Sequence, residues 1–180
     1  SITKSLVERM GGTITFTSRL GEGTTFCIIL PFRICQPGEL PRQETEAPAP
    51  HALNGMHLLL VEDNALNMEI AAFMLESAGA ELAKAQNGQE ALDAFRKSPA
   101  GYFDAILMDV MMPVMDGYQT TRAIRALERP DAADVPIIAM TAHAFVEDRQ
   151  HAYEAGMTEH LAKPLDQTAL VRTLQRWKKD

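Results

Sequence analysis

Apolar residues in the longer, C-terminal part of the chain form five short runs, each followed by a segment with helical spacing. The runs are expected as strands at residues 57–61, 81–85, 105–108, 135–140 and 160–162. The helices are expected at residues 65–78, between 88 and 99, and at 118–127, 145–154 and 166–178. Apolar strands that alternate with helices are typical of a sheet covered on both faces. The sequence therefore predicts an α/β fold with a five-stranded, doubly wound parallel sheet and five helices.

Two of these helices carry a clear apolar stripe. In the first helix of the region, which Gly79 ends, the stripe consists of Leu66, Ile70, Phe73 and Met74. In the last helix it consists of Leu170, Val171, Leu174 and Trp177.

The first 33 residues carry a different pattern. A helix is indicated by the apolar stripe of Ile2, Leu6, Val7 and Met10, and Gly11 and Gly12 end it. Two strands follow at residues 13–18 and 24–30, and the glycines between them favour a hairpin turn over a phosphate-binding loop. Such a small unit buries little, so its apolar faces are expected to be loosely ordered or to pack on the following domain.

Residues 34–54 are rich in proline and poor in bulky apolar side chains, which predicts a linker. The sequence thus divides into a small unit at 1–33, a linker at 34–54 and a domain at 55–180.

Composition and charge narrow the functional classes. The net charge of the 180 residues is −7, and residues 1–50 balance five basic against five acidic side chains, so the excess lies in the remainder. This distribution excludes a basic surface for nucleic acid. The chain has no apolar run of membrane-spanning length and no signal peptide, so we expect no membrane contact in this fragment. Cys27 and Cys35 are too far apart for a CxxC motif and fit a reducing, cytoplasmic compartment.

Polar side chains stand where four of the five predicted strands end. Glu62 and Asp63 follow the first strand, Asp109 the third, Thr141 the fourth and Lys163 the fifth. Ligands of such sheets bind beyond the carboxyl ends of the strands, where these groups would converge. Each residue alone has a simple structural explanation, but their joint occurrence at one edge favours a site.

Three carboxylates in one crevice repel one another unless a cation neutralises them. Oxygen ligands suit a hard ion, and Mg²⁺ is the natural candidate. A metal, an ammonium group and a further carboxylate suit phosphoryl chemistry, in which Asp109 is the expected nucleophile.

Four motifs carry a resemblance to a known family: LLLVEDN at residues 58–64, ILMDVMMPVMDG at 106–117, IIAMTA at 137–142 and LAKPL at 161–165. With them, residues 56–178 resemble the receiver domain of two-component response regulators, which has a flavodoxin-like fold. The resemblance implies that Asp109 accepts a phosphoryl group from a phosphohistidine. It also implies that Mg²⁺ is held by Glu62, Asp63, Asp109 and the backbone carbonyl of Met111.

The resemblance also assigns roles around the nucleophile. Lys163 would contact the phosphoryl group, and Thr141 would move to hydrogen-bond it. Many receivers have a tyrosine or phenylalanine three residues before this lysine as a second switch residue, whereas this chain has His160. Pro113 is expected to fix the loop after Asp109, and Gly117 to permit a turn before the next helix.

Residues 1–33 resemble the end of the ATP-binding domain of a histidine kinase, with its last helix and closing β-hairpin. The glycine-rich lid and the asparagine-bearing helix of that domain are not in this sequence, so we predict that the fragment does not bind ATP. The resemblance implies that the parent chain is a hybrid sensor histidine kinase, a class of protein for which a membrane anchor elsewhere in the chain is compatible with this fragment. Because the kinase domain is incomplete, the sequence leaves the enzymatic activity of the fragment open.

The expected partners are a phosphohistidine donor, in the same or another chain, and a histidine phosphotransfer protein as acceptor. The fourth helix and fifth strand of the receiver region are a candidate surface for a homodimer. Two alternatives remain: a pseudo-receiver that only binds proteins, and a phosphohydrolase of the haloacid-dehalogenase type. A phosphohydrolase of this type requires an aspartate two residues after the nucleophile, where this chain has Met111.

Overall fold

The computed structural model describes residues 2–21, 23–32, 51–142 and 146–178. The chain divides into two compact units, Ser1–Glu44 and Thr45–Asp180. Cys35, most of the predicted linker and the predicted helix start at residue 145 lie outside the described residues. Within the described ranges, no helix is both long enough and apolar enough to cross a membrane.

The first unit consists of a helix and an antiparallel hairpin, as the sequence predicts. Helix α1 (Ile2–Arg9) precedes strands β1 (Thr13–Arg19) and β2 (Gly23–Ile29). Phe16 lies opposite Phe26, with their ring centroids 5.9 Å apart. Both rings are about two-thirds exposed, and Val7 is the single buried side chain among the described residues of this unit.

The second unit is built on a five-stranded parallel sheet in the order β4-β3-β5-β6-β7. Its strands are β3 (His57–Val61), β4 (Glu81–Ala85), β5 (Ala105–Asp109), β6 (Ile137–Thr141) and β7 (Glu159–Ala162). The observed sheet confirms the predicted doubly wound fold. Strand β5 lies at its centre.

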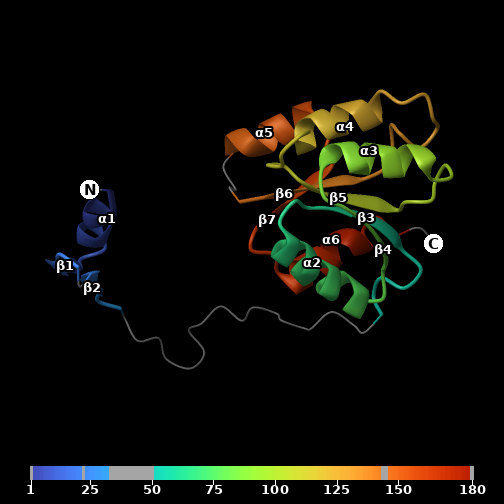
Figure 1. Ribbon diagram of the computed structural model, residues 1–180. Coiled ribbons are helices and arrows are strands. Elements are labelled where there is room, and N and C mark those ends of the chain that lie inside the picture. The colour runs from blue at the N-terminus through green and yellow to red at the C-terminus, as the bar shows by residue number, and fades with distance from the viewer. Residues whose placement is uncertain (1, 22, 33–50, 143–145, 179–180) are drawn as a thin grey trace. The chain divides into compact units, whose positions relative to one another are not determined.

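Helices cover both faces of this sheet, as Figure 1 shows. Helices α3 (Gly88–Lys97), α4 (Gly117–Arg125) and α5 (Val146–Glu154) lie on one face, and α2 (Ala65–Ser77) and α6 (Gln167–Gln175) lie on the other. Four of the five begin at an Asn or Asp whose side chain accepts hydrogen bonds from the first turn: Asn64, Asn87, Asp116 and Asp166. These caps are local signals, and they explain why the helix starts are readable in the sequence.

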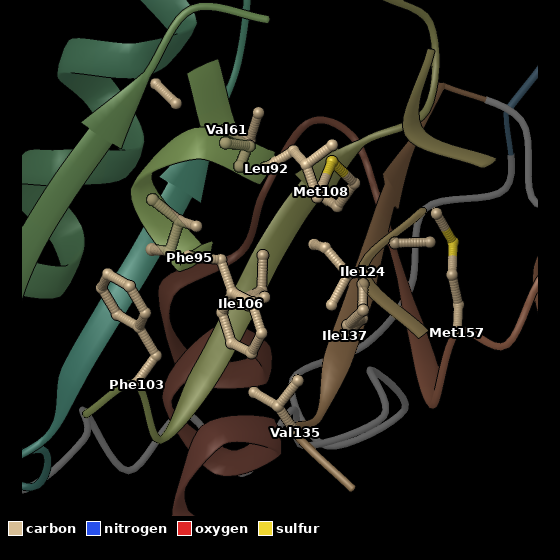
Figure 2. Packing of buried hydrophobic residues seen from close by; sticks show 14 of the residues in the cluster. Val61, Leu92, Phe95, Phe103, Ile106, Met108, Ile124, Val135, Ile137 and Met157 are labelled. Atoms are coloured by element: carbon tan, nitrogen blue, oxygen red, sulfur yellow. The ribbon is translucent and has the colours of Figure 1, made fainter. Parts of the chain in front are cut away.

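The core has two apolar layers, one on each side of the sheet. Successive strand residues alternate between the layers, so that Leu59 and Val61 join one layer while Leu58 and Leu60 join the other. Figure 2 shows the first layer, where Ile106 and Met108 of β5 lie among side chains that include Phe95 of α3 and Ile124 of α4. Every residue of β5 is buried, and its one polar residue, Asp109, is the last residue of the strand.

Helix α2 does not pack on the sheet with the face that carries Leu66, Ile70 and Phe73. Its buried residues are Met68, Ala71, Ala72 and Leu75. Leu66, Ile70 and Phe73 are 69%, 45% and 73% exposed. The helix is apolar on two sides, and the side with small alanines lies against the sheet.

Several element ends differ slightly from the prediction. Strand β5 includes Asp109, β6 runs from Ile137 to Thr141, and α6 ends at Gln175 rather than at residue 178. Residues 51–54, assigned to the linker from the sequence, form a turn in which Leu53 is fully buried. The amide of Leu53 donates to the carbonyl of Ala78, which joins this turn to the end of α2. The structured part of the second unit therefore includes the end of the predicted linker.

Candidate functional site

The predicted site residues lie at one edge of the sheet, at the carboxyl ends of its strands. Glu62 and Asp63 follow β3, Asp109 ends β5 and Thr141 ends β6. Lys163 follows β7, and its amide donates to the carbonyl of Thr141 at 2.7 Å. Parallel pairing with β5 in the middle thus brings residues from four strands to one place.

Three carboxylates form an acidic cluster at this edge. One oxygen from each of Glu62, Asp63 and Asp109 lies within 4.8 Å of the others. Glu62 and Asp109 are buried, whereas Asp63 is exposed, so the cluster opens to solvent on one side. Carboxylate oxygens with room for water ligands suit a hard divalent cation. The cluster can therefore bind a metal.

Lys163 joins the two buried carboxylates. Its Nζ lies 2.6 Å from Oε2 of Glu62 and 2.8 Å from Oδ2 of Asp109. A single ammonium group therefore partly neutralises both acids, and this attraction offsets part of the free-energy penalty of burying their charges. The other Asp109 oxygen, Oδ1, accepts a hydrogen bond from the amide of Met111 at 3.3 Å. A role for the Met111 carbonyl as a metal ligand stays a prediction.

The environment shifts the proton affinity of both partners. Burial raises the pKa of the Asp109 carboxyl, and the hydrogen bond from Lys163 lowers it without cancelling that effect. Burial also lowers the pKa of Lys163, but its bonds to Asp109 and Glu62 outweigh burial and leave the pKa raised. The lysine is therefore held in its charged form. A cation in the cluster would favour the ionised form of Asp109 as well.

Asn67 is a site residue that the sequence analysis missed. Its Nδ2 donates to Oε1 of Glu62 at 2.9 Å, from the first turn of α2. The sequence gives no sign of this bond, because an asparagine near a helix start is ordinarily explained by capping. Here Asn64 is the cap, and Asn67, whose amide reaches the acid, lies three positions after it.

The loop after Asp109 is held by close backbone packing. Gly117 begins α4 without a left-handed backbone, and a Cβ at this position would lie 2.4 Å from the carbonyl oxygen of Asp109. The glycine is thus required by close approach rather than by the turn that the sequence predicts. The left-handed residue of this loop is Val114, with φ of 70°, and its side chain is 86% exposed.

The two predicted switch residues lie on neighbouring strands. Thr141 is half-buried at the end of β6, and His160 is half-buried on β7, in register with Ala139. Ala142, beside the threonine, is exposed. Their movement in a switch stays a prediction.

An apolar groove lies beside the site, between α2 and the segment after β7. The cavity has a volume of about 470 Å³, and Ile70, Met74 and Leu165 line it together with Glu62 and Lys163. Leu66 and Phe73 are also exposed on α2 and follow the same helical spacing as Ile70. The exposed stripe of α2 and the groove thus place apolar surface next to the acids and the lysine.

Comparisons with known proteins agree on the second unit. Residues 58–175 match the family model described as the response regulator receiver domain. The receiver domain of the sensor histidine kinase PA1611 from Pseudomonas aeruginosa is 44% identical, with a TM-score of 0.62 over 68% of this chain and 97% of that one. That crystal structure has a magnesium ion coordinated in the active-site cleft.

A second solved structure contains a partner protein. It is the complex of the histidine phosphotransfer protein Ypd1 with the receiver domain of Ssk1 from Saccharomyces cerevisiae. The match is 31% identical, with a TM-score of 0.62, and covers 68% of this chain and 88% of that one.

A third match extends over the first unit as well. The autoinducer 2 sensor kinase/phosphatase LuxQ of Vibrio cholerae is 34% identical over 99% of this chain. This chain spans only 20% of the length of that protein, and 13% of the length of the sensor protein GacS of Pseudomonas syringae, to which it is 37% identical.

Proposed function

The chain belongs to the response regulator receiver family, and from this premise we propose that Asp109 accepts a phosphoryl group from a phosphohistidine. The observation that carries the proposal is the position of the Asp109 carboxylate. It ends the central strand, lies within 4.8 Å of two further acids and is 2.8 Å from the lysine ammonium. An oxygen nucleophile, a candidate metal cluster and a cation for the phosphoryl oxygens therefore share one edge.

The proposed step exchanges one bond to phosphorus for another. An Asp109 oxygen attacks the phosphorus, the bond to the donor imidazole nitrogen breaks, and an acyl phosphate forms while the imidazole nitrogen keeps the bonding electron pair. Glu62, Asp63 and Asp109, with the Met111 carbonyl, would hold Mg²⁺, which would neutralise charge on the phosphoryl oxygens. Lys163 would contribute the same stabilisation from its own side, and Thr141 would hydrogen-bond the product.

The proposed partner is a histidine phosphotransfer protein, which would exchange the phosphoryl group with Asp109. The exposed stripe of α2 supports this, because a partner that delivers an imidazole to the acids must cover the surface beside them. The Ypd1–Ssk1 complex is a precedent in a related receiver. The original donor would be the phosphohistidine of a histidine kinase, in the same or another chain.

We also propose a hybrid sensor histidine kinase as the origin of the chain, and the cytoplasm as its location. In this proposal residues 1–33 are the end of the kinase ATP-binding domain, 34–54 a linker and 55–180 the receiver. The helix and hairpin of the first unit and the match to LuxQ over 99% of the chain support it.

The proposal is tested by phosphorylation with acetyl phosphate and Mg²⁺, followed by intact mass. We expect a single base-labile phosphoryl adduct on the wild-type chain and none on Asp109→Ala. Asp93→Asn, which removes a carboxylate on α3, is the control and should still form the adduct. An adduct that persists in Asp109→Ala would disprove the assignment of Asp109. A wild-type chain that forms no adduct would favour a pseudo-receiver.

A further inference from the structure

Glu62 is the most buried acid of the site, and each of its carboxylate oxygens has its own partner. The residue is 2% exposed. Oε2 lies 2.6 Å from Lys163 Nζ, and Oε1 accepts the hydrogen bond of Asn67 at 2.9 Å. The Asn67 amide therefore controls the one oxygen of Glu62 that the lysine does not hold.

The backbone of Asn67 is itself fixed. The side-chain oxygen of Asn64 accepts hydrogen bonds from the amides of Leu66 and Asn67, at 3.0 and 3.1 Å. The helix cap thus places Asn67 at the start of α2, and its side chain reaches back to the residue after β3. This short chain of bonds connects the helix start to the acidic cluster.

We propose that Asn67 is a positioning residue that sets the orientation of Glu62 for cation binding and limits its hold on Lys163. This inference rests on the proposed function, since it concerns the same acidic cluster. Glu62 and Asp109 share one ammonium group, with nitrogen–oxygen distances of 2.6 and 2.8 Å. A residue that orients Glu62 therefore also affects how closely the Lys163 ammonium can approach Asp109 and a phosphoryl group bound there.

Loss of the Asn67 amide would leave Oε1 of Glu62 buried without that donor. A buried carboxylate oxygen without a donor is unfavourable. The Glu62 side chain would therefore rotate, either to bring both oxygens to the Lys163 ammonium or to move toward the other acids. Either movement disturbs the arrangement that a cation requires. Loss of a residue that orients a metal ligand typically weakens metal binding by about 10-fold or more.

A purely structural role for Asn67 predicts a different result. Leucine is close to asparagine in size, and both leucine and alanine are better helix formers. Asn67→Leu and Asn67→Ala should therefore not weaken α2 through helix propensity. If Asn67 only stabilised the helix start, these variants would bind Mg²⁺ as the wild type does.

The experiment is a Mg²⁺ titration of the full chain followed by amide NMR shifts, which also report whether each variant is folded. We expect the Kd for Mg²⁺ to rise about 10-fold in Asn67→Leu and Asn67→Ala. Asn67→Gln keeps an amide donor and should recover part of the affinity. The control is Gln150→Ala, which removes an amide–carboxylate bond of the same 2.9 Å length, from Gln150 to Glu154 on the exposed face of α5, and should not change the Kd.

The outcomes separate this inference from the proposed function. An unchanged Kd in folded Asn67→Leu overturns the positioning role while leaving the phosphoryl site intact. If Asn67→Leu or Asn67→Ala does not fold, the other still decides, because Asn67→Gln must bind Mg²⁺ more tightly than the folded variant that lacks the amide. If Asn67→Gln does not fold, the Kd values of Asn67→Leu and Asn67→Ala decide against that of the wild type. A wild-type chain without measurable Mg²⁺ binding overturns both proposals.

Discussion

Arg129 and Asp131 show how single side chains connect loops in this fold. Arg129 donates to Asp131 through Nε and Nη2, at 2.6 and 2.8 Å, and to the carbonyls of Ser98 and Pro99 beyond the end of α3. Asp131 also accepts from the amide of Gly101 at 2.7 Å. The pair thus ties the segment after α3 to the segment that leads to β6.

The Asp131 carboxylate should contribute stability that depends on pH. The hydrogen bonds from Arg129, with smaller contributions that include the Gly101 amide, lower its pKa to about 2. A depressed folded-state pKa stabilises the protein above the unfolded value near 4, and this stability is lost as the pH falls toward 2. We expect Asp131→Asn to lower the free energy of unfolding by about 2 kcal/mol at pH 7.

Urea denaturation of wild type and Asp131→Asn at pH 7, 4 and 2.5 would measure this difference. It should shrink at each step toward acid. Asp134→Asn, which removes an exposed acid from the same segment, should show a much smaller difference at pH 7. A deficit in Asp131→Asn that stays constant down to pH 2.5 would contradict the assigned cause.

Among the helices, α2 best separates what the sequence can and cannot predict. Its start and end follow from local signals, the cap at Asn64 and the glycine at position 79. Its orientation does not, because Met68 and Leu75 on one side compete with Leu66 and Phe73 on the other. Which side faces the sheet depends on how closely the backbone can approach, and the alanines decide that.

The exposed stripe of α2 leads to a prediction about the partner. Phe73 is 73% exposed, so Phe73→Ser should change the free energy of unfolding by no more than about 0.5 kcal/mol. If a histidine phosphotransfer protein covers this stripe, the variant should lose about 10-fold in the rate of phosphoryl exchange with that protein. Phosphorylation by acetyl phosphate should not change.

Both rates can be followed by phosphate-affinity electrophoresis, with a histidine phosphotransfer protein as one reactant. Tyr153→Ser on α5 removes an exposed aromatic ring from another helix and serves as the matched control. Equal exchange rates in the two variants would show that the stripe is not the docking surface.

For the whole molecule, the sequence predicts the number and direction of the strands and most of the site. The acids and Lys163 could be found because each lies at the end of a strand or just after it, which is a property of position along the chain. Asn67 could not, since its bond to Glu62 depends on how α2 lies over the end of β3. The same holds for Leu53, whose burial in the core is decided by the approach of α2 to the turn before β3.

The two compact units lead to a prediction about truncation. The sheet of the second unit is covered on both faces by its own helices, so residues 51–180 should fold without the first unit. We expect their free energy of unfolding to lie within about 0.5 kcal/mol of that of the full chain's second unit. Chemical denaturation followed at Trp177, which lies in this unit, measures both.

A slightly shorter chain provides the control. Residues 57–180 lack Leu53 and Met56, which are 0% and 1% exposed, and should be less stable by about 2–5 kcal/mol. If residues 57–180 were as stable as residues 51–180, the buried turn before β3 would not belong to the folded unit.

The candidate site takes its groups from the ends of four strands, so its reactivity can report whether the sheet has formed completely. A refolding chain whose β7 has not yet paired with β6 cannot present Lys163 to Asp109. Acyl phosphate would then form only on molecules with a completed sheet. The refolding protein can be exposed to brief pulses of acetyl phosphate and then quenched. The phosphorylated fraction, measured by mass spectrometry, would give the fraction of molecules with a complete sheet at each time.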